Sequence, residues 1–239
     1  MDEDHARGGW SSAIKRAAEI DTGFSRAYAS YFDTIRADAA ISARYKLLFL
    51  ACCAAARGVR GRVGSAMHLA VDAGLQPDEA WAGALTMLMS RGDPAFSAMA
   101  DALGDVDDSR HVHEGPLEGP HEGPIDVDAA KAYFERAFDA VPPAVQLLAD
   151  HAPTLMAGYA AMRSWALEHS PLSSLHVELL LVAVNVADYQ DRLAEIHARG
   201  ARSQGATEAQ LLEAVICAVP VAGLPAHISG SNAIFASRD

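Results

Sequence analysis

The chain has 239 residues, which is room for one large domain or for two of about a hundred residues that each bury a core. With 51% hydrophobic, 7% aromatic and 21% charged residues it has the composition of a soluble globular protein, and its abundant alanine favours helices. The formal net charge of −12 argues against nucleic acid or an anionic membrane as a partner, because both attract basic surfaces. We therefore expect a small molecule as the partner.

Residues 1–10 contain Asp2, Glu3, Asp4 and two glycines and do not resemble a signal peptide. No apolar run is long enough to span a bilayer. The three cysteines are an odd number in apolar helical surroundings, which predicts no disulfide framework and favours a reducing compartment. We expect a cytoplasmic protein.

The N-terminal half has the pattern of consecutive helices. Apolar spacing and capping residues predict helices over 11–20, from a cap at 21 or 22 to about 35, over 42–56, up to 73, from 76 to Gly92, and from there to about 103. Gly74 is a candidate helix terminator, and Pro77 stands where proline is tolerated in a first helical turn.

The C-terminal half has the same character. Asp126 is a candidate N-cap for a helix that runs to about 140, where Pro142 and Pro143 break it. Further helices are expected over 143–150, 153–169, 173–188, 190–203, 207–219 and 225–236, and Pro220 and Gly223 separate the last two. The predicted fold class is all-α.

A shift of 131 residues without a gap aligns the two halves. Tyr28 then falls on Tyr159, Gly74 on Gly205, and the Gly92-Asp93-Pro94 turn on Gly223-Leu224-Pro225. We interpret this as a duplicated helical unit, in which turn glycines and prolines persist for backbone reasons. The predicted division is an N-terminal repeat (1–105), a linker (106–125) and a C-terminal repeat (126–239).

The linker repeats HEGP, LEGP and HEGP at 113–124, which opposes both helix and sheet. Its histidines and glutamates are potential metal ligands: His111, His113, Glu114, His121 and Glu122. Without helical or C-x-x-C spacing they do not form a preorganised site, so we expect no metal.

The candidate site lies between 178 and 225. Glu178 stands in an otherwise apolar helix, and 19 residues later comes His197. Helical spacing places Gln190, Leu193 and His197 on one face. A carboxylate beside an imidazole fixes its tautomer and favours its protonated form, which predicts a proton donor. The alternative is an ordinary core histidine with a structural partner.

Under the 131-residue shift the N-terminal half lacks this pair. Glu178 falls on Leu47 and His197 on Ala66, so we expect that the first repeat has lost its site residues. His68 falls on Arg199, away from that face, and we interpret it as an ordinary surface histidine or one whose hydrogen bonds are satisfied.

The order Glu178, positions 190, 193 and 197, Gly205, then Gly-Leu-Pro-Ala at 223–226 resembles the carboxymuconolactone decarboxylase and alkylhydroperoxidase-D-like superfamily. The alkylhydroperoxidase branch has a C-x-x-C pair where this chain has Gln190 and Leu193, and a dithiol relay needs both thiols. The resemblance therefore points to the decarboxylase branch and away from peroxidase activity.

This resemblance implies two tandem alkylhydroperoxidase-D-like bundles, a homotrimeric assembly and a cofactor-independent lyase acting on a carboxylated lactone or similar ring. His197 and Glu178 are the catalytic candidates. The substrate-binding candidates are Gln190, Tyr189, His227 and Arg62. The other hypothesis is a non-catalytic binding or scaffold protein with a decayed site. An enzyme should have a closed pocket that contains both Glu178 and His197, whereas in a decayed scaffold these side chains should lie apart or the pocket should be filled.

Overall fold

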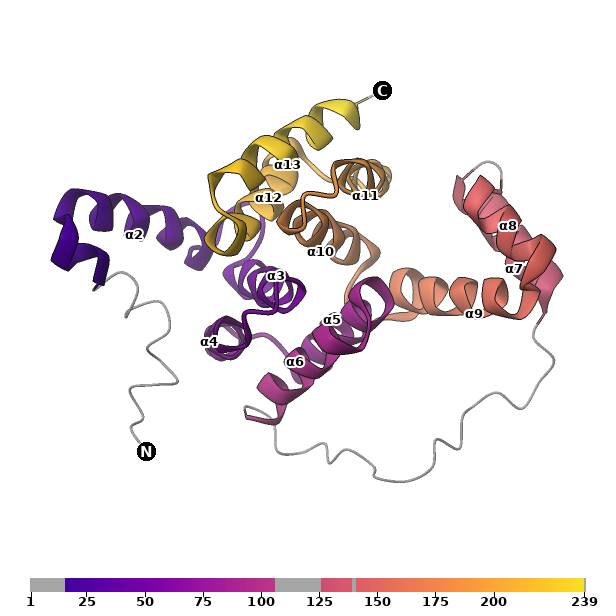
Figure 1. The fold of residues 1–239 in the computed structure, drawn as a ribbon, viewed down its shortest axis with the longest axis horizontal. Coiled ribbons are helices and arrows are strands. Elements are labelled where there is room, and N and C mark those ends of the chain that lie inside the picture. The colour runs from indigo at the N-terminus through magenta and orange to yellow at the C-terminus, as the bar shows by residue number, and fades with distance from the viewer. Residues whose placement is uncertain (1–15, 106–125, 139–140, 239) are drawn as a thin grey trace. The chain divides into compact units, whose positions relative to one another are not determined.

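The computed structural model describes residues 16–105, 126–138 and 141–238, and within them the regular elements are all helices, which confirms the all-α prediction (Figure 1). The helices group into two compact units. Of the described residues, 16–105 and 170–238 belong to the first unit, and 126–138 with 141–169 belong to the second. The two helices that carry Glu178 and His197 both lie in the first unit.

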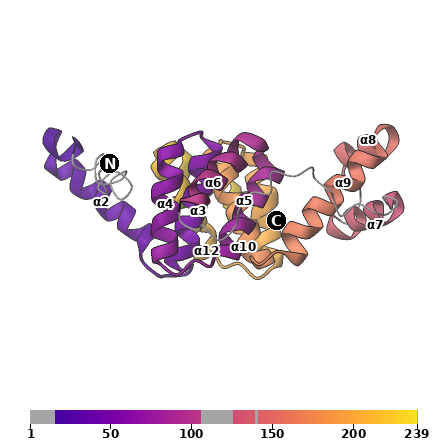
Figure 2. The same cartoon turned by 90° about the horizontal axis from the view of Figure 1, so that it is seen from below.

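Nine helices with described bounds make up the first unit. They are α2 (Thr22–Arg36), α3 (Ala43–Ala56), α4 (Arg60–Asp72), α5 (Pro77–Arg91), α6 (Asp93–Gly104), α10 (Ser174–Ala187), α11 (Asp191–Ser203), α12 (Glu208–Ala222) and α13 (Leu224–Ala236). Helices α3 and α10 lie in the interior and pack against each other and against α12, while α4 and α11 flank them (Figures 1 and 2).

The central position of α3 and α10 follows from their composition. Both are apolar on every face, and α10 is buried at every residue from 177 to 187. A helix without a polar face is stable only inside a protein, because burying its apolar side chains away from water stabilises the fold and exposing them forfeits that free energy. The more polar α4 and α11 consequently lie outside them.

The second unit contains α7 (Val127–Phe138), α8 (Pro143–His151), α9 (Pro153–Ser164) and a π-helical turn, Trp165–His169. Asp126 accepts a hydrogen bond from the Ala129 N–H at 2.9 Å, so its predicted role as an N-cap is confirmed. Phe134 and Met156 are fully buried in a small core where α7 and α8 cover α9. The ring centroids of Phe134 and Tyr159 are 5.2 Å apart.

Helix bounds in the two halves agree with the 131-residue shift. Adding 131 to the bounds of α3, α4 and α5 gives those of α10, α11 and α12, and α13 begins 131 residues after α6. The turn residues agree as well, since Gly74 has φ +91° and Gly205 has φ +87°. Both positions need a left-handed backbone, which glycine adopts without steric cost. Duplication remains a hypothesis that this agreement supports.

The structure corrects two helix boundaries. Helix α12 continues through Pro220 to Ala222, where the prediction ended it at 219. The proline lies in the last turn, and its missing N–H removes only one backbone bond. The helix expected over 153–169 ends as α9 at Ser164 and continues as the π-helical turn. The linker histidines and glutamates lie outside the described residues.

All three cysteines are free and fully buried. Burial raises the pKa of Cys52, Cys53 and Cys217, because a thiolate loses its hydration inside the protein. Such thiols are poor nucleophiles. Among the described helices, none is by itself both long enough and apolar enough to cross a membrane.

Candidate active site

The candidate site is built where α11 packs on α10. Ser173 caps α10 by accepting a hydrogen bond from the His176 N–H, and Glu178 follows at the start of the second turn. Helix α11 is strongly amphipathic, with Ala194, Ala198 and Ala201 turned to the interior. These small residues let α11 approach α10 closely, so that a side chain on one helix can reach the other.

Glu178 and His197 form the pair that the spacing predicts. The Nδ1 atom of His197 lies 2.7 Å from Oε2 of Glu178. Their side chains are only 14% and 7% exposed. A hydrogen bond that is largely withdrawn from water is stronger than one in solvent, and it fixes the orientation of the ring.

The pairing also determines the chemistry of the ring. An ionised carboxylate can only accept a hydrogen bond, so Nδ1 of His197 carries a proton. The other ring nitrogen, Nε2, is the one available for proton transfer. It accepts a proton when the ring is neutral and donates one when the ring is charged. This arrangement suits general acid/base catalysis.

Gly200 makes room for the carboxylate. A Cβ atom at this position would lie 2.6 Å from Cδ and Oε1 of Glu178 and 2.8 Å from Oε2. Cβ atoms essentially never approach other atoms this closely, so a side chain here would force the Glu178 carboxylate to shift. The sequence analysis missed this residue.

The 131-residue shift could have revealed it. Gly200 falls on Leu69, just as Glu178 falls on Leu47 and His197 on Ala66. The N-terminal half thus has two leucines and an alanine where the C-terminal half has an acid, a glycine and a histidine. Leu47 is 2% exposed and Ala66 is fully buried, so apolar packing occupies these positions in the first half.

The turn between α10 and α11 holds two further candidates. Tyr189 has φ +56°, a left-handed conformation that is uncommon for a residue with a side chain and costs about 1 kcal/mol or more. Its hydroxyl donates a hydrogen bond to the Ala222 carbonyl, and Arg57 lies 5.8 Å from its ring centroid. Gln190 is exposed and stands at the N-cap of α11.

Ion pairing anchors the same turn. Asp188 accepts a hydrogen bond from Nε of Arg91 at 2.6 Å, and Nη2 of Arg91 donates to the buried Asn185 at 2.9 Å. These contacts join the end of α10 to the end of α5. They hold the backbone from which α11, and therefore His197, begins.

The remaining candidates lie on different surfaces. Leu193 is 44% exposed on α11, and His227 is exposed on α13, which packs against α11. Arg62 is half-buried on α4, which packs against α3 and α6, and loss of solvent lowers its pKa. The structure therefore brings Glu178 and His197 together, and the roles of Gln190, Tyr189, His227 and Arg62 remain predictions.

A hollow of about 420 Å³ lies between α4 and α6, and we call it the α4–α6 hollow. Its lining includes neither Glu178 nor His197. The pair is therefore not part of this hollow.

Comparison with known proteins gives a family match for the C-terminal part of the chain. No curated protein matches the chain. The model of the Carboxymuconolactone decarboxylase family matches residues 153–234, about a third of the chain. The matched region contains Glu178, His197 and Gly200. The part of the chain that carries the candidate pair is therefore similar to the Carboxymuconolactone decarboxylase family.

Proposed function

We propose that the chain is a cofactor-independent lyase of the carboxymuconolactone decarboxylase type, acting in the cytoplasm on a carboxylated lactone or a similar cyclic acid. The observation that carries the proposal is the 2.7 Å hydrogen bond between the nearly buried Glu178 and His197. The family match supports it, because it covers the region of this pair. Peroxidase chemistry is not proposed, since Gln190 and Leu193 offer no thiols.

The reaction has two steps. The bond between the ring carbon and its carboxylate breaks, carbon dioxide leaves, and the bonding electrons enter the conjugated carbonyl to form an enolate. A proton then adds to carbon, so each turnover consumes one proton. His197, charged at the start, donates it from Nε2 and regains it from solvent, while Glu178 stabilises the imidazolium.

The neighbouring residues favour the first step. Val182 and Val186 are fully buried in α10, and Leu193 and Ile196 stand on α11 with partial exposure. An apolar surrounding removes water from a substrate carboxylate and so favours its loss as neutral carbon dioxide. Arg62, Gln190, Tyr189 and His227 are the proposed substrate-binding residues.

The proposal is tested by a screen. Carboxylated lactones and quinone-like acids are incubated with the protein, and release of carbon dioxide is measured against the His197→Ala variant. Release that depends on His197 supports the enzyme. Full release by the variant would show that His197 is not the proton donor, and no release with any compound favours the scaffold hypothesis.

Gly200→Ala is expected to damage the site without touching either catalytic candidate. The added methyl group overlaps the Glu178 carboxylate, so we expect about a tenfold lower kcat with little change in KM, and a loss of about 1–3 kcal/mol in stability. Nitrogen-15 NMR of the imidazole should show a smaller population of the tautomer protonated at Nδ1.

Two further variants control this result. Glu178→Asp shortens the acid by one methylene and should partly restore kcat in the Gly200→Ala background. Gly158 lies in α9, where a Cβ would meet nothing within 4 Å, so Gly158→Ala should stabilise the protein by about 0.5–1 kcal/mol. An unchanged tautomer population in Gly200→Ala would show that Gly200 does not position Glu178.

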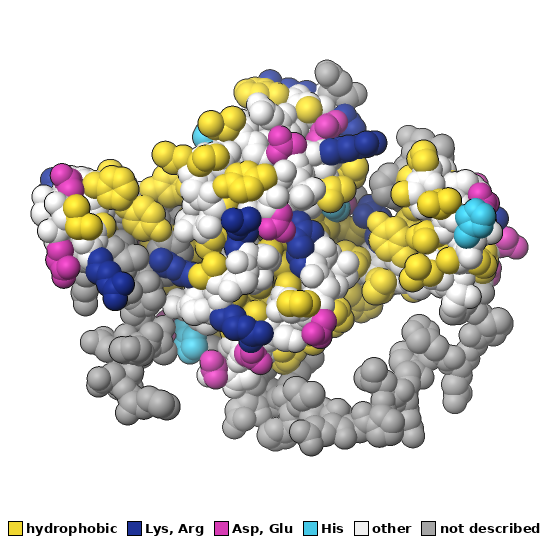
Figure 3. All heavy atoms as spheres, viewed as in Figure 1, with side chains coloured by type: hydrophobic (Ala, Val, Ile, Leu, Met, Phe, Trp, Pro, Cys, Tyr) yellow, Lys and Arg dark blue, Asp and Glu magenta, His cyan; other side chains and the backbone are white. Residues whose placement is uncertain are grey.

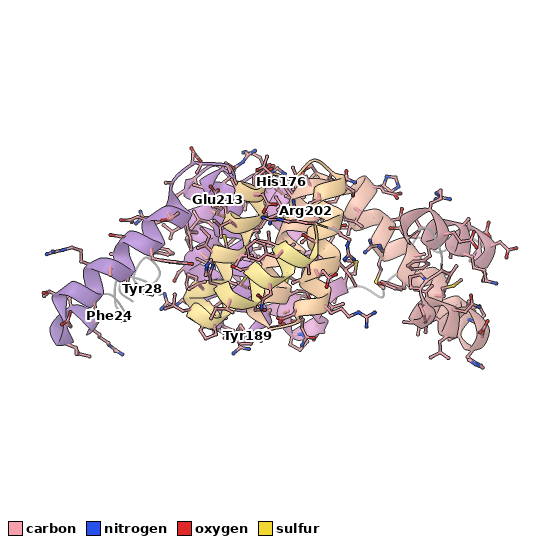
Figure 4. The ribbon with its side chains drawn as sticks, turned by 90° about the horizontal axis from the view of Figure 1, so that it is seen from above. Phe24, Tyr28, His176, Tyr189, Arg202 and Glu213 are labelled. Atoms are coloured by element: carbon pink, nitrogen blue, oxygen red, sulfur yellow. The ribbon has the colours of Figure 1, made fainter. Side chains whose placement is uncertain are left out.

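We further propose that the chain assembles into a homotrimer. Helix α2 extends from the first unit, and only its C-terminal part carries large buried residues, Phe32 and Ile35. Phe24, in the first turn of α2, is 67% exposed (labelled in Figure 4), and Ile20, just before the helix, is 89% exposed. Figure 3 shows hydrophobic side chains over this helix. Apolar side chains gathered on one arm are typical of a surface that another subunit covers.

Light scattering across micromolar concentrations should therefore give three times the 25.2 kDa mass of one chain. Phe24→Asp should shift the population toward monomer, because a buried charge without a partner opposes association. Ser30→Asp, at an exposed polar position of the same helix, is the matched control and should change little. A monomeric mass at every concentration would contradict the trimer.

A further inference from the structure

Among the described residues of the first unit, the large apolar side chains that are more than half exposed lie on two segments. Ile20 and Phe24 stand at the start of α2, and we call them the α2 tip. Leu224, Ile228 and Phe235 stand on α13, where they are 69%, 63% and 59% exposed, and we call them the α13 stripe. The stripe follows one face, because positions i, i+4 and i+11 align along a helix.

The α13 stripe points away from the contacts that hold α13 on the protein. The inner face of the helix is buried through small residues, among them Ala226, Gly230 and Ala233. A Cβ atom added to Gly230 would lie 2.4 Å from Cγ1 of Val215, so α13 already packs closely on α12. The stripe therefore remains on the outer side of the helix, at the edge of the first unit (Figure 1).

The N-terminal half indicates that this position in the fold does not require apolar residues. In the 131-residue register α6 corresponds to α13, and Asp93, Ser97 and Gly104 stand where α13 has its stripe. Asp93 and Gly104 are exposed, and Ser97 is partly exposed. Solvent thus meets a charged, a polar and a small residue on α6. Three large apolar side chains at the same positions of α13 are typical of a surface that another molecule covers.

The α2 tip has an excess of negative charge. Asp21 accepts a hydrogen bond from the Phe24 N–H at 2.6 Å, which fixes a carboxylate beside the exposed ring. Glu19 is a second exposed acid next to Ile20. Among the described residues up to Phe24, only Arg16 opposes these two acids.

The C-terminal end of the α13 stripe has an excess of positive charge. The guanidinium of Arg238 lies 4.6 Å from the centroid of the Phe235 ring. Arg238 and Arg202 share one carboxylate, that of Glu208, at 3.2 and 2.7 Å. One of the two positive charges is therefore unbalanced. The two apolar surfaces are thus complementary in charge, which favours their contact and sets its direction.

Two different surfaces on one chain suit a head-to-tail contact between copies. A contact of α13 with α13 would place like charges together and leave the α2 tip exposed. When the tip of one copy covers the stripe of the next, each copy buries both surfaces, and the repeated contact closes a ring.

We propose that the α2 tip of one subunit packs on the α13 stripe of the next, with the acids of the tip facing Arg238. The occupant of the α13 stripe is thus a second copy of this chain. The proposal rests on the homotrimer proposed above and assigns the contact between its subunits.

Cysteine cross-linking tests the contact. Full-length chains with Phe24→Cys and with Ile228→Cys are co-expressed and treated with diamide, which oxidises two thiols to a disulfide. We expect a cross-linked pair of chains on a non-reducing gel from the co-expressed variants and none from either variant alone. The three native cysteines should not react, because all are fully buried.

Ser97→Cys is the matched control, because Ser97 has the position of Ile228 on α6. Co-expressed with Phe24→Cys, it should give no cross-link. Equal cross-linking of the two pairs would overturn the proposal, since it would indicate random collision. A cross-link in Ile228→Cys alone would also overturn it, because two stripes would then contact each other.

Light scattering separates this contact from the homotrimer itself. Ile228→Asp should weaken association about tenfold or more, as Phe24→Asp does, because both place a charge in the same apolar contact. Ser97→Asp should leave the mass unchanged, and circular dichroism checks the fold of each variant. A trimer that Phe24→Asp dissociates and Ile228→Asp does not would overturn the proposed contact and leave the homotrimer standing. A wild-type chain that is monomeric at every concentration would overturn both.

Discussion

His197→Ala is expected to lower kcat by about 100-fold or more on the substrate that the screen identifies, with the fold intact. The variant loses the nitrogen that delivers the proton and the positive charge that stabilises the enolate. The Glu178 side chain, which is 7% exposed, loses its partner. Water can enter the space that the missing ring leaves. Steady-state kinetics give kcat and KM, and far-ultraviolet circular dichroism reports the fold.

Glu178→Gln is the graded comparison. The amide keeps the size of the side chain and loses its charge, so the ring remains in place while the imidazolium is less stabilised. We expect a smaller loss of kcat than in His197→Ala. Unchanged activity in His197→Ala would refute the assignment of His197, whereas a larger loss in Glu178→Gln would make the acid the principal catalytic group.

Much of the helical framework could be predicted, because it depends on local signals. Gly74, Gly92, Gly205 and Gly223 all have positive φ and end helices near the predicted positions. The Glu178–His197 contact was also predictable. One residue interrupts an apolar helix, the other lies on a helical face, and a short turn joins the two helices.

Long-range features were not predictable in this way. The chain order suggests two successive units, whereas described helices of both halves, α2–α6 and α10–α13, belong to one compact unit, and α7–α9 belong to a second. The 131-residue shift singles out Gly200, but its role becomes visible only when the position of the Glu178 carboxylate is known. The α4–α6 hollow depends on which side chains are absent between two helices that another helix, α5, separates in the chain. Periodicity within one helix contains no information about such contacts.

The contact between Lys46 and Glu213 is another feature that the sequence analysis missed, and it joins α3 to α12. The Lys46 side chain is fully buried, and its Nζ lies 3.2 Å from Oε2 of Glu213 and 2.9 Å from the Thr34 carbonyl. Glu213 also accepts hydrogen bonds from the N–H groups of Ala40 and Ile41, at 3.0 and 2.8 Å. One carboxylate thus neutralises a buried ammonium and satisfies the backbone between α2 and α3 (Glu213 is labelled in Figure 4).

Glu213→Ala is therefore expected to destabilise the protein by about 3–5 kcal/mol, since it leaves a buried ammonium without a counter-ion. Chemical denaturation followed by circular dichroism measures the loss. Lys46→Met with Glu213→Gln removes both charges and keeps an acceptor for the two N–H groups, so the double variant should be more stable than Glu213→Ala by at least about 2 kcal/mol. A loss below about 1 kcal/mol in Glu213→Ala would mean that water reaches Lys46, and that apolar packing of α3 against α10 and α12 is sufficient to hold the two halves together.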